Sequence, residues 1–272
     1  MNDSRYQREM DFHDKTFSED SRKSAAKFYS ITHQTSKAFY RDYLAGHCVG
    51  KRVLEYGCGP DSHALFIASK DGAVTGIDLS PVAIRKNRDA SKERSLSQAS
   101  FSVMNAELLA FSDNSFDLIC GNGILHHLEL DRCFAELSRT LRPEGTAVFL
   151  EPLGHNPLIN LYRRLTPGMR SVDEHPLLSA DFIKASGYFG CVDISYFHLT
   201  SLLAVLFSGF SWFPRIVRQL NSLDQALFRR LPWVRKHAWA VAMVLSEPKK
   251  NIGMLPSRNG ASVPSNTWLK RS

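Results

Sequence analysis

Short apolar runs alternate with amphipathic stretches between residues 51 and 151, and this alternation limits the folds open to the chain. The runs have the length of buried strands, and the stretches between them repeat apolar residues with a helical period. Such alternation predicts βαβ units that form a doubly wound α/β sheet with parallel strands and right-handed crossovers. The predicted strands cover residues 52–56, 73–78, 99–104, 116–121 and 146–151, and the predicted helices 62–70, 81–95 and 131–141.

The segments outside this region differ from it in composition. Residues 1–50 are polar and helix-prone, and residues 152–178 form a loop rich in Pro, Asn and His. We expect a helix near 179–186, a strand at 192–197, a helical insertion over 199–235 and a last strand at 239–245. Residues 248–272 lack periodicity and are predicted to be a disordered tail, which leaves 51–247 as the main domain.

Charge and cysteine content exclude some classes of protein. The five cysteines are an odd number without a Cys-x-x-Cys pair, which argues against a disulfide framework or a zinc site and favours a reducing compartment. Charged residues stand where a signal peptide needs an apolar core, so we expect a cytoplasmic protein. The formal net charge of +7 is compatible with nucleic acid, a membrane surface or an anionic small molecule as partner.

A Gly-x-Gly turn follows the first predicted strand, in Val53-Leu54-Glu55-Tyr56-Gly57-Cys58-Gly59-Pro60. Glycine permits positive φ and a close approach of backbone amides to a ligand. The same turn also suits a plain strand–helix junction, and Ser62 stands where a dinucleotide fingerprint has its third glycine. Asp78 closes the next strand, nineteen positions after Gly59, where a carboxylate can accept both hydroxyls of a ribose. Together these residues predict a nucleoside-containing cofactor.

Three further blocks follow at spacings that are familiar from one family. They are Asn105-Ala106-Glu107 ahead of Phe111, Ser115-Phe116-Asp117-Leu118-Ile119 leading to Leu125-His126-His127-Leu128, and Leu141-Arg142-Pro143-Glu144-Gly145. With the first two blocks, they resemble the class I S-adenosylmethionine-dependent methyltransferases, and in particular the ubiquinone/menaquinone-type (methyltransferase type 11) branch that methylates small molecules. The resemblance covers residues 52–152 and implies a seven-strand, Rossmann-like sheet.

The resemblance also implies a set of cofactor-binding residues. Glu55, Gly57, Cys58 and Gly59 would surround the methionine part of S-adenosyl-L-methionine, Asp78 would hold the ribose, and Leu79, Asn105 and Ala106 would meet the adenine. Gly121, Asn122 and His127 would face the amino-acid end. Asn105 replaces the usual Asp of the family, and Glu144 replaces the first glycine of a Pro-Gly-Gly turn, which we expect to affect only a loop.

A sulfonium methyl group is already activated, so the protein mainly aligns donor and acceptor, and a base is needed only where the acceptor must lose a proton. We expect a small, lipophilic acceptor, with O-methylation favoured over C-methylation. A macromolecular (RNA or protein) methyltransferase and a non-catalytic, cofactor-binding regulatory subunit are the alternatives. An Asn/Asp-Pro-Pro-Tyr motif is absent after the fourth predicted strand, where Gly121-Asn122-Gly123-Ile124 stands, and this disfavours nucleic acid as substrate.

Acceptor-side candidates follow the fifth predicted strand. Glu151, His155 and His175 are predicted to be catalytic, because ligands bind at the carboxyl ends of strands in such sheets; no metal site is predicted. The two histidines would otherwise cap helices or bond to the backbone. Residues 1–50 are predicted to form a helical lid in which Phe12, His13, Asp14, Tyr29 and Tyr40 cover the cofactor, or in which the aromatic residues fix a helix to the sheet.

The insertion at 199–235 is apolar at first and then basic. No Asp, Glu, Lys or Arg occurs from Ile194 to Pro214, although polar residues interrupt this stretch and disfavour a membrane span. Leu199, Leu202, Leu203, Leu206 and Phe210 follow a helical period, so one face must be buried. We expect that face to roof the acceptor pocket. The alternatives are packing on the sheet and peripheral contact with an anionic membrane beside Arg215 and Arg218. The sequence leaves the acceptor's identity and the oligomeric state open.

Overall fold

The computed structural model describes residues 3–19, 31–166, 171 and 173–250. A seven-stranded sheet forms its centre, with the strand order β3-β2-β1-β4-β5-β7-β6. Strands β1 to β5 run parallel to one another, whereas β7 is antiparallel to both β5 and β6. The strands are β1 (Arg52–Tyr56), β2 (Ala73–Asp78), β3 (Ala99–Val103), β4 (Phe116–Asn122), β5 (Leu141–Pro152), β6 (Phe189–Phe197) and β7 (Ala240–Pro248).

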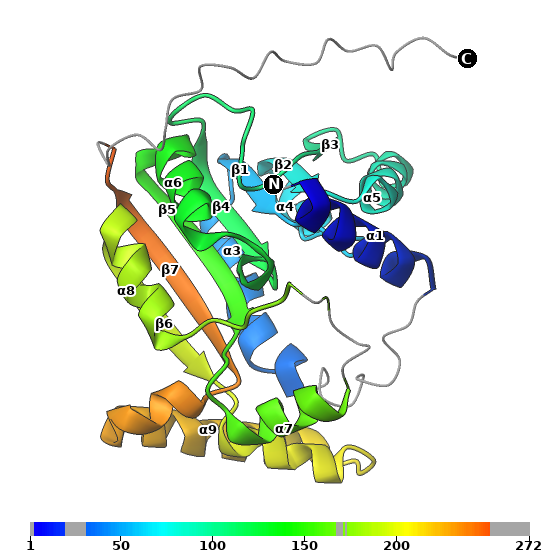
Figure 1. Cartoon of the computed structure of the whole chain (residues 1–272). Helices are drawn as coiled ribbons and strands as arrows, with labels where there is room; N and C mark the ends of the chain where they lie inside the picture. The colour runs from blue at the N-terminus through cyan, green and yellow to red at the C-terminus, as the bar shows by residue number, and fades with distance from the viewer. Residues whose placement is uncertain (1–2, 20–30, 167–170, 172, 251–272) are drawn as a thin grey trace.

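Helices cover both faces of this sheet (Figure 1). Along the chain they are α1 (Asp3–Glu19), α3 (Ser36–His47), α4 (Ala64–Ala68), α5 (Pro81–Glu93), η2 (Leu125–His127), α6 (Leu130–Thr140), α7 (Pro157–Leu165), α8 (Ser179–Tyr188), η4 (Thr200–Phe207), α9 (Phe213–Arg230) and η5 (Pro232–His237). The predicted α/β sheet and the helical insertion before the last strand are thus confirmed.

Two hydrophobic clusters fill the space between the sheet and its helices. Leu54, Ile119 and Phe149 point toward the cluster that includes residues of α6 and α8. Their sequence neighbours Val53 and Leu118 point toward the other cluster, which includes residues of α3, α4 and α5. This alternation follows the two-residue period of a strand. Because helices cover both faces of the sheet, side chains of both directions are buried, and the strands are continuous apolar runs in the sequence.

Helix α5 begins where the sequence predicts it. Ser80 precedes Pro81, and its hydroxyl accepts a hydrogen bond from the backbone N–H of Ala83 at 3.1 Å. Proline at the first helical position lacks only an N–H group that would have no partner within the helix. The helix ends at Glu93, within the predicted range of 81–95.

Strand β5 is longer than predicted. It begins at Leu141, which pairs with Phe116, and the register then shifts before Leu118 pairs with Thr146. The buried Leu141 side chain holds this early start in the core, while Arg142, Pro143 and Glu144 are exposed. Glu144 therefore lies in the irregular first part of a strand rather than in the expected loop.

The insertion between β6 and β7 is anchored by its single acidic residue. Asp224 is fully buried and accepts hydrogen bonds from the backbone N–H groups of Leu199, Thr200 and Ser201, at 3.0, 2.6 and 3.2 Å. These bonds tie α9 to the start of η4 and satisfy amides that would otherwise be orphaned at a helix start. No helix in the described part of the chain is long and apolar enough to cross a bilayer.

Helix α3 is fixed to the same corner of the molecule by His198. This residue is fully buried with a positive φ of 66°, and its Nε2 atom lies 2.8 Å from the hydroxyl of Ser36. Burial lowers the pKa of His198 to about 4, so the ring is neutral at physiological pH. Tyr40 of α3 also lies fully buried in the core and fixes α3 to the sheet, whereas Phe12 and His13 of α1 line the cleft described below. Tyr29 and nearly all of the predicted tail at 248–272 lie outside the described residues.

Candidate active site

A cleft of about 1760 Å³ opens at the carboxyl ends of β1, β2, β4 and β5. Ligand sites in proteins usually have volumes of about 300–1,000 Å³, so this cleft has room for a nucleoside cofactor and a second molecule. Its location is the one expected for an open α/β sheet, outside the strand ends where the chain order reverses.

The turn after β1 needs its glycines. Gly57 and Gly59 have φ values of 57° and 52°, in the region that residues with a side chain rarely adopt. A Cβ atom on Gly57 would also lie 2.6 Å from the Cδ1 atom of Ile124. The turn is therefore both left-handed and closely packed, and it leaves backbone amides at the edge of the cleft.

Glu55 holds this turn against the start of α4. Its carboxylate is buried and accepts hydrogen bonds from the backbone N–H groups of His63 and Ala64, at 2.8 and 3.0 Å, and from the hydroxyl of Ser62. Glu55 also lines the cleft. These contacts show that Glu55 fixes the conformation of the segment between β1 and α4.

Asp78 links the turn to the end of β2. One carboxylate oxygen accepts a hydrogen bond from the N–H of Gly59 at 2.9 Å, and the other accepts from the N–H of Ser80 at 2.8 Å. Burial raises the pKa of Asp78, against the two backbone hydrogen bonds, which lower it. Each oxygen keeps a lone pair, and Asp78 lines the cleft, so the carboxylate fits the ribose-binding role.

The other predicted cofactor-binding residues fall into two groups. Nine of the eleven predicted residues line the cleft, namely Glu55, Gly57, Cys58, Gly59, Asp78, Leu79, Ala106, Asn122 and His127. Asn105 and Gly121 are not among the lining residues. The side-chain oxygen of Asn105 accepts from the N–H of Glu107 at 2.9 Å, and a Cβ atom on Gly121 would lie 2.7 Å from the ring of Phe149. Asn105 therefore shapes the loop after β3, and Gly121 allows the close packing of β4 against Phe149 of β5.

Helix α1 lies across the β2–α5 side of the cleft (Figure 1). The buried carboxylate of Glu107 fastens it there by pairing with Arg5 and accepting a hydrogen bond from Tyr6 at 2.9 Å, while it also accepts from the N–H of Glu129 at 2.8 Å. Asp14 accepts a hydrogen bond from the hydroxyl of Ser80 at the other end. The sequence analysis missed the role of Glu107, although its motif was recognised.

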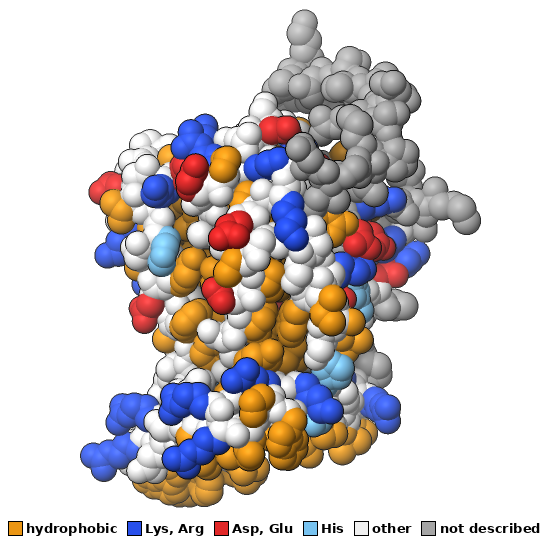
Figure 2. Space-filling model, turned by 90° about the vertical axis from the view of Figure 1, so that its left-hand side faces the viewer, with side chains coloured by type: hydrophobic (Ala, Val, Ile, Leu, Met, Phe, Trp, Pro, Cys, Tyr) orange, Lys and Arg blue, Asp and Glu red, His pale blue; other side chains and the backbone are white. Residues whose placement is uncertain are grey.

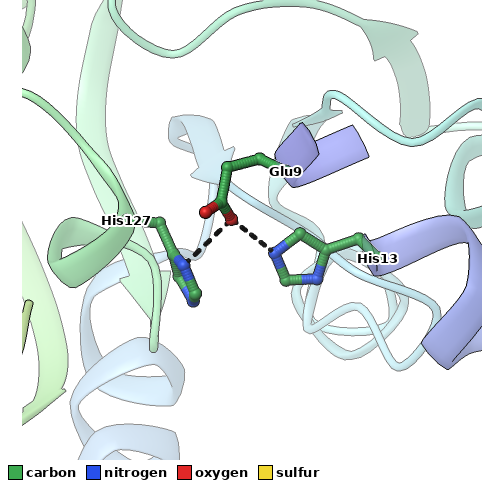
Figure 3. A group of neighbouring side chains, drawn as sticks. All are labelled: Glu9, His13 and His127. Carbon is green, nitrogen blue, oxygen red and sulfur yellow. Dashed lines mark ion pairs between the residues drawn. The ribbon is translucent and has the colours of Figure 1, made fainter. Parts of the chain in front are cut away.

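Glu9 of α1 reaches into the cleft between two histidines (Figure 3). The same carboxylate oxygen lies 3.2 Å from His127 Nδ1 and 3.4 Å from His13 Nε2. Burial alone would raise the pKa of Glu9, but the hydrogen bonds from His127 and His13 outweigh it and hold this pKa well below its usual value. Burial lowers the pKa of His127.

This group also has the composition of a metal site. Glu9, His13 and His127 each offer one ligand atom, and these atoms lie within 4.8 Å of one another; His126, His127 and Glu174 form a second such group. The Glu9 carboxylate lies within ion-pair distance of both imidazole rings. The interaction of Glu9 with His127 therefore works as a polar contact that holds α1 over the cleft.

A carboxylate–histidine pair lies at the end of β5. The buried Glu151 accepts hydrogen bonds from the N–H groups of Ile124 and Leu125 with one oxygen, both at 2.9 Å, and its other oxygen lies 2.7 Å from His126 Nδ1. When Nδ1 donates, the Nε2 atom of His126 is left as a proton acceptor. Both residues line the cleft. The sequence analysis singled out Glu151 but did not pair it with His126.

The other two residues predicted to be catalytic lie elsewhere. His155 Nε2 accepts a hydrogen bond from the N–H of Ser179 at 3.2 Å, and the exposed His175 donates its own backbone N–H to His126 O at 2.8 Å. Neither of them is among the residues that line the described cleft. Their catalytic role remains a prediction, and the described contacts correspond to the alternative of backbone and loop bonding.

The expected roof over the acceptor side is also not formed by the insertion. Among described residues, none from 199 to 235 lines the cleft. The part of the cleft beside Glu151 is instead bounded by apolar residues of β5, α7 and the chain around the start of β7, namely Leu150, Pro152, Ile159, Tyr162, Trp239 and Ala240. The predicted buried face is wrong for three of its five residues, because Leu203, Leu206 and Phe210 are exposed and Leu202 is buried. The segment folds as the 3-10 helix η4, whose three-residue turn places Leu203 and Leu206 on a different face from Leu202.

Known proteins share this domain. The model of the methyltransferase type 11 family, described as a methyltransferase domain, matches residues 54–149. The chain is 35% identical over 107 residues to the methyltransferase GfsG of Streptomyces halstedii, covering 38% of this chain and 37% of the relative. It is 35% identical over 103 residues to a chloroplastic tocopherol O-methyltransferase of Arabidopsis thaliana, covering 37% of this chain and 30% of the relative. The chain thus spans about a third of the length of these curated relatives.

A solved structure shares the fold over a larger part of the chain. It is the geranyl diphosphate C-methyltransferase from Streptomyces coelicolor A3(2), in complex with Mg2+, geranyl diphosphate and S-adenosyl-L-homocysteine. The TM-score is 0.55 at 14% sequence identity, and the match covers 79% of this chain and 81% of the other. Residues 54–149 therefore form a class I, S-adenosylmethionine-dependent methyltransferase domain, which confirms the resemblance found in the sequence.

Replacing Asp78 with Asn should weaken cofactor binding by at least about tenfold. The substitution removes the negative charge and turns one of the two carboxylate oxygens, a hydrogen-bond acceptor, into an amide NH2 donor. Calorimetric titration with S-adenosyl-L-homocysteine measures this change. Asp89→Asn, on the exposed side of α5, is the matched control and should bind as the wild type does. An unchanged Kd in Asp78→Asn would remove Asp78 from the site, and tighter binding of NAD by the wild type would overturn the cofactor assignment.

Proposed function

We propose that the chain transfers a methyl group from S-adenosyl-L-methionine to a small, lipophilic acceptor, with oxygen as the favoured target atom. The observation that carries this proposal is the single cleft in which the Gly57–Gly59 turn and Asp78 lie on one side and the His126–Glu151 pair lies on the other. A macromolecular substrate is disfavoured, because α1 lies across part of this cleft.

The cofactor half of the cleft suits a cation. When bound, S-adenosyl-L-methionine supplies an activated methyl group on a positively charged sulfur. Glu55 places a buried carboxylate and Asp78 a partly buried one at this edge of the sheet, and Glu9 adds a third, buried carboxylate from the covering helix. Carboxylates held in a buried site interact with a cation more strongly than they would in water. The proposed binding set is the nine lining residues named above, with Asn105 shaping the loop after β3 and Gly121 allowing the close packing of β4 beside them.

The acceptor half combines apolar walls with a base. Ile159, Tyr162 and Trp239 contribute apolar and aromatic surface, which supports a lipophilic acceptor. His126 is the proposed base: its Nε2 atom would take the proton that leaves an acceptor hydroxyl. Glu151 is a positioning residue that holds the ring by Nδ1 and stabilises the imidazolium form. An acidic carbon acid could lose its proton to the same atom, so C-methylation is the second candidate.

Separation of the labelled products tests the acceptor class. The purified protein is incubated with tritium-labelled methyl donor and a cell extract, and the label is counted in organic-extractable, protein and nucleic-acid fractions. The proposal predicts label in the organic fraction, lost in Asp78→Asn. Label in protein or nucleic acid would support the macromolecular alternative. Donor binding without transfer to any fraction would support a non-catalytic regulatory subunit.

Replacing His126 with Asn should lower kcat by roughly 10²–10⁴ on the acceptor found in that experiment, because the proton acceptor is lost. Cofactor Kd should stay near the wild-type value, since His126 is proposed to act on the acceptor. Glu151→Gln should lower kcat as well and change the pH profile, because the imidazolium form loses its carboxylate partner. His47→Asn, at the exposed C-terminal end of α3 and outside the cleft, is the control, and we expect wild-type kinetics from it. Wild-type kcat in His126→Asn would place the proton transfer elsewhere or remove it from the reaction.

A further inference from the structure

An exposed apolar surface covers the end of the molecule formed by α7, η4, α9 and η5. Figure 2 shows hydrophobic side chains gathered along this lower end, with Lys and Arg side chains above them. We define the basal patch as the large apolar side chains that these elements and their connections expose, namely Leu158, Leu161, Leu165, Leu203, Leu206, Phe210, Trp212, Leu223, Leu231 and Trp233. Monomeric soluble proteins rarely expose apolar patches of this kind, and such patches mark interaction surfaces.

The exposure of these side chains is built into the local structure. Helix α9 buries Phe213, Val217 and Phe228 against the rest of the protein, and η4 buries Leu202 and Ala204. Leu206 and Trp233, in contrast, are 71% and 67% exposed. The insertion therefore has an inner apolar face that completes its own packing and a second apolar face that no described part of the chain covers.

The charges around the basal patch have one sign. Arg164, Arg215, Arg218, Arg229, Arg230 and Lys236 are all exposed on the same elements. Within residues 157–165 and 199–237, Asp224 is the single acidic residue. It is fully buried and accepts hydrogen bonds from backbone amides. The exposed charges of the elements that form the basal patch are thus all positive.

We propose that the basal patch docks on the surface of an anionic lipid bilayer. Apolar side chains enter the boundary between headgroups and acyl chains, and the surrounding cations bind lipid phosphates. Phe210 and Trp212 stack with their ring centroids 4.9 Å apart, and aromatic rings favour the membrane–water interface. A second copy of the chain fits less well, because its basal patch would bring arginines against arginines without an exposed acid to pair with them.

The position of α7 connects the basal patch to the cleft. Ile159, Tyr162 and Arg163 of this helix line the cleft, while Leu158, Leu161 and Leu165 belong to the patch. A lipophilic acceptor dissolved in the bilayer would therefore meet the cleft across a single helix. This route rests on the proposed function, whereas the docking itself does not.

Co-sedimentation with vesicles tests the docking without methyl donor or acceptor. We expect the wild type to bind vesicles of phosphatidylcholine mixed with phosphatidylglycerol at least about tenfold more tightly than pure phosphatidylcholine, and to be released by salt. The double variant Leu206→Ser/Trp233→Ser should lose about tenfold or more in affinity, because two apolar anchors are removed. Arg218→Gln/Arg229→Gln/Arg230→Gln should lose the preference for anionic vesicles.

Matched controls use equally exposed residues outside the basal patch. Ile183→Ser, on α8 and 76% exposed in the wild type, controls for the loss of an apolar surface residue. Arg85→Gln/Lys92→Gln/Arg132→Gln, on α5 and α6, controls for the loss of three positive charges. Both should bind as the wild type does, and all variants should keep the wild-type Tm because the replaced side chains are exposed.

Three outcomes would overturn the proposal. Wild-type protein that does not sediment with anionic vesicles excludes the bilayer as the partner. An equal loss of vesicle affinity in patch and control variants shows that net charge or non-specific adsorption, and not this surface, drives binding. A dimer that light scattering detects in the wild type and that Leu206→Ser/Trp233→Ser abolishes assigns the patch to a second copy of the chain. Because no methyl transfer is measured, a failure here leaves the proposed activity unaffected, and the reverse also holds.

Discussion

Buried or partly buried carboxylates at strand ends hold the loops from which the site is built. Glu55 at the end of β1, Asp78 at the end of β2 and Glu151 at the end of β5 each accept backbone N–H groups from a turn at the same edge of the sheet. A buried backbone amide without a partner is costly, and so is an unpaired buried carboxylate. Each therefore satisfies the other, and the turns after β1, β2 and β4 take one defined shape.

The same arrangement gives the cleft its chemical character. The carboxylates that organise the turns also line the cavity, so their negative charge faces the ligand while part of their hydrogen-bonding capacity is used by the backbone. This is a preorganised environment in which no large rearrangement is needed when a cation binds. Glu107 extends the principle to α1, because it holds both the loop at Glu129 and the helix that covers the cleft. Loss of any of these carboxylates would disturb both the loop and the site.

The sequence predicts the features that depend on neighbours along the chain. The strand–helix alternation, the cap at Ser80 and the glycines of the turn after β1 follow from local periodicity and backbone geometry, and the structure has them. The motif blocks also indicate the family, because their spacing reflects strands that end at one edge. Asp78 could be placed at the cleft for the same reason.

The features that depend on distant segments could not be predicted in this way. Arg5 and Glu107 are about a hundred positions apart, and Glu151 and His126 are joined only by the adjacent pairing of β4 and β5. The insertion shows a related limit: its apolar period predicts one buried face, but the packing of α9 on β6 and η4 leaves Leu202 buried and Leu206 exposed. His155 and His175 were chosen for the composition of their loop, which does not fix the direction of a side chain.

The central claim is that the carboxyl edge of the sheet, together with α1, forms one cofactor site. Hydrogen–deuterium exchange of the wild-type protein, with and without S-adenosyl-L-homocysteine, tests it most directly. Our account predicts slower exchange at the amides of residues 57–63 and 78–80 and along α1, with no change in α8 on the outer layer of the sheet. Unchanged exchange in the two turns, with slowing elsewhere on the surface, would contradict it.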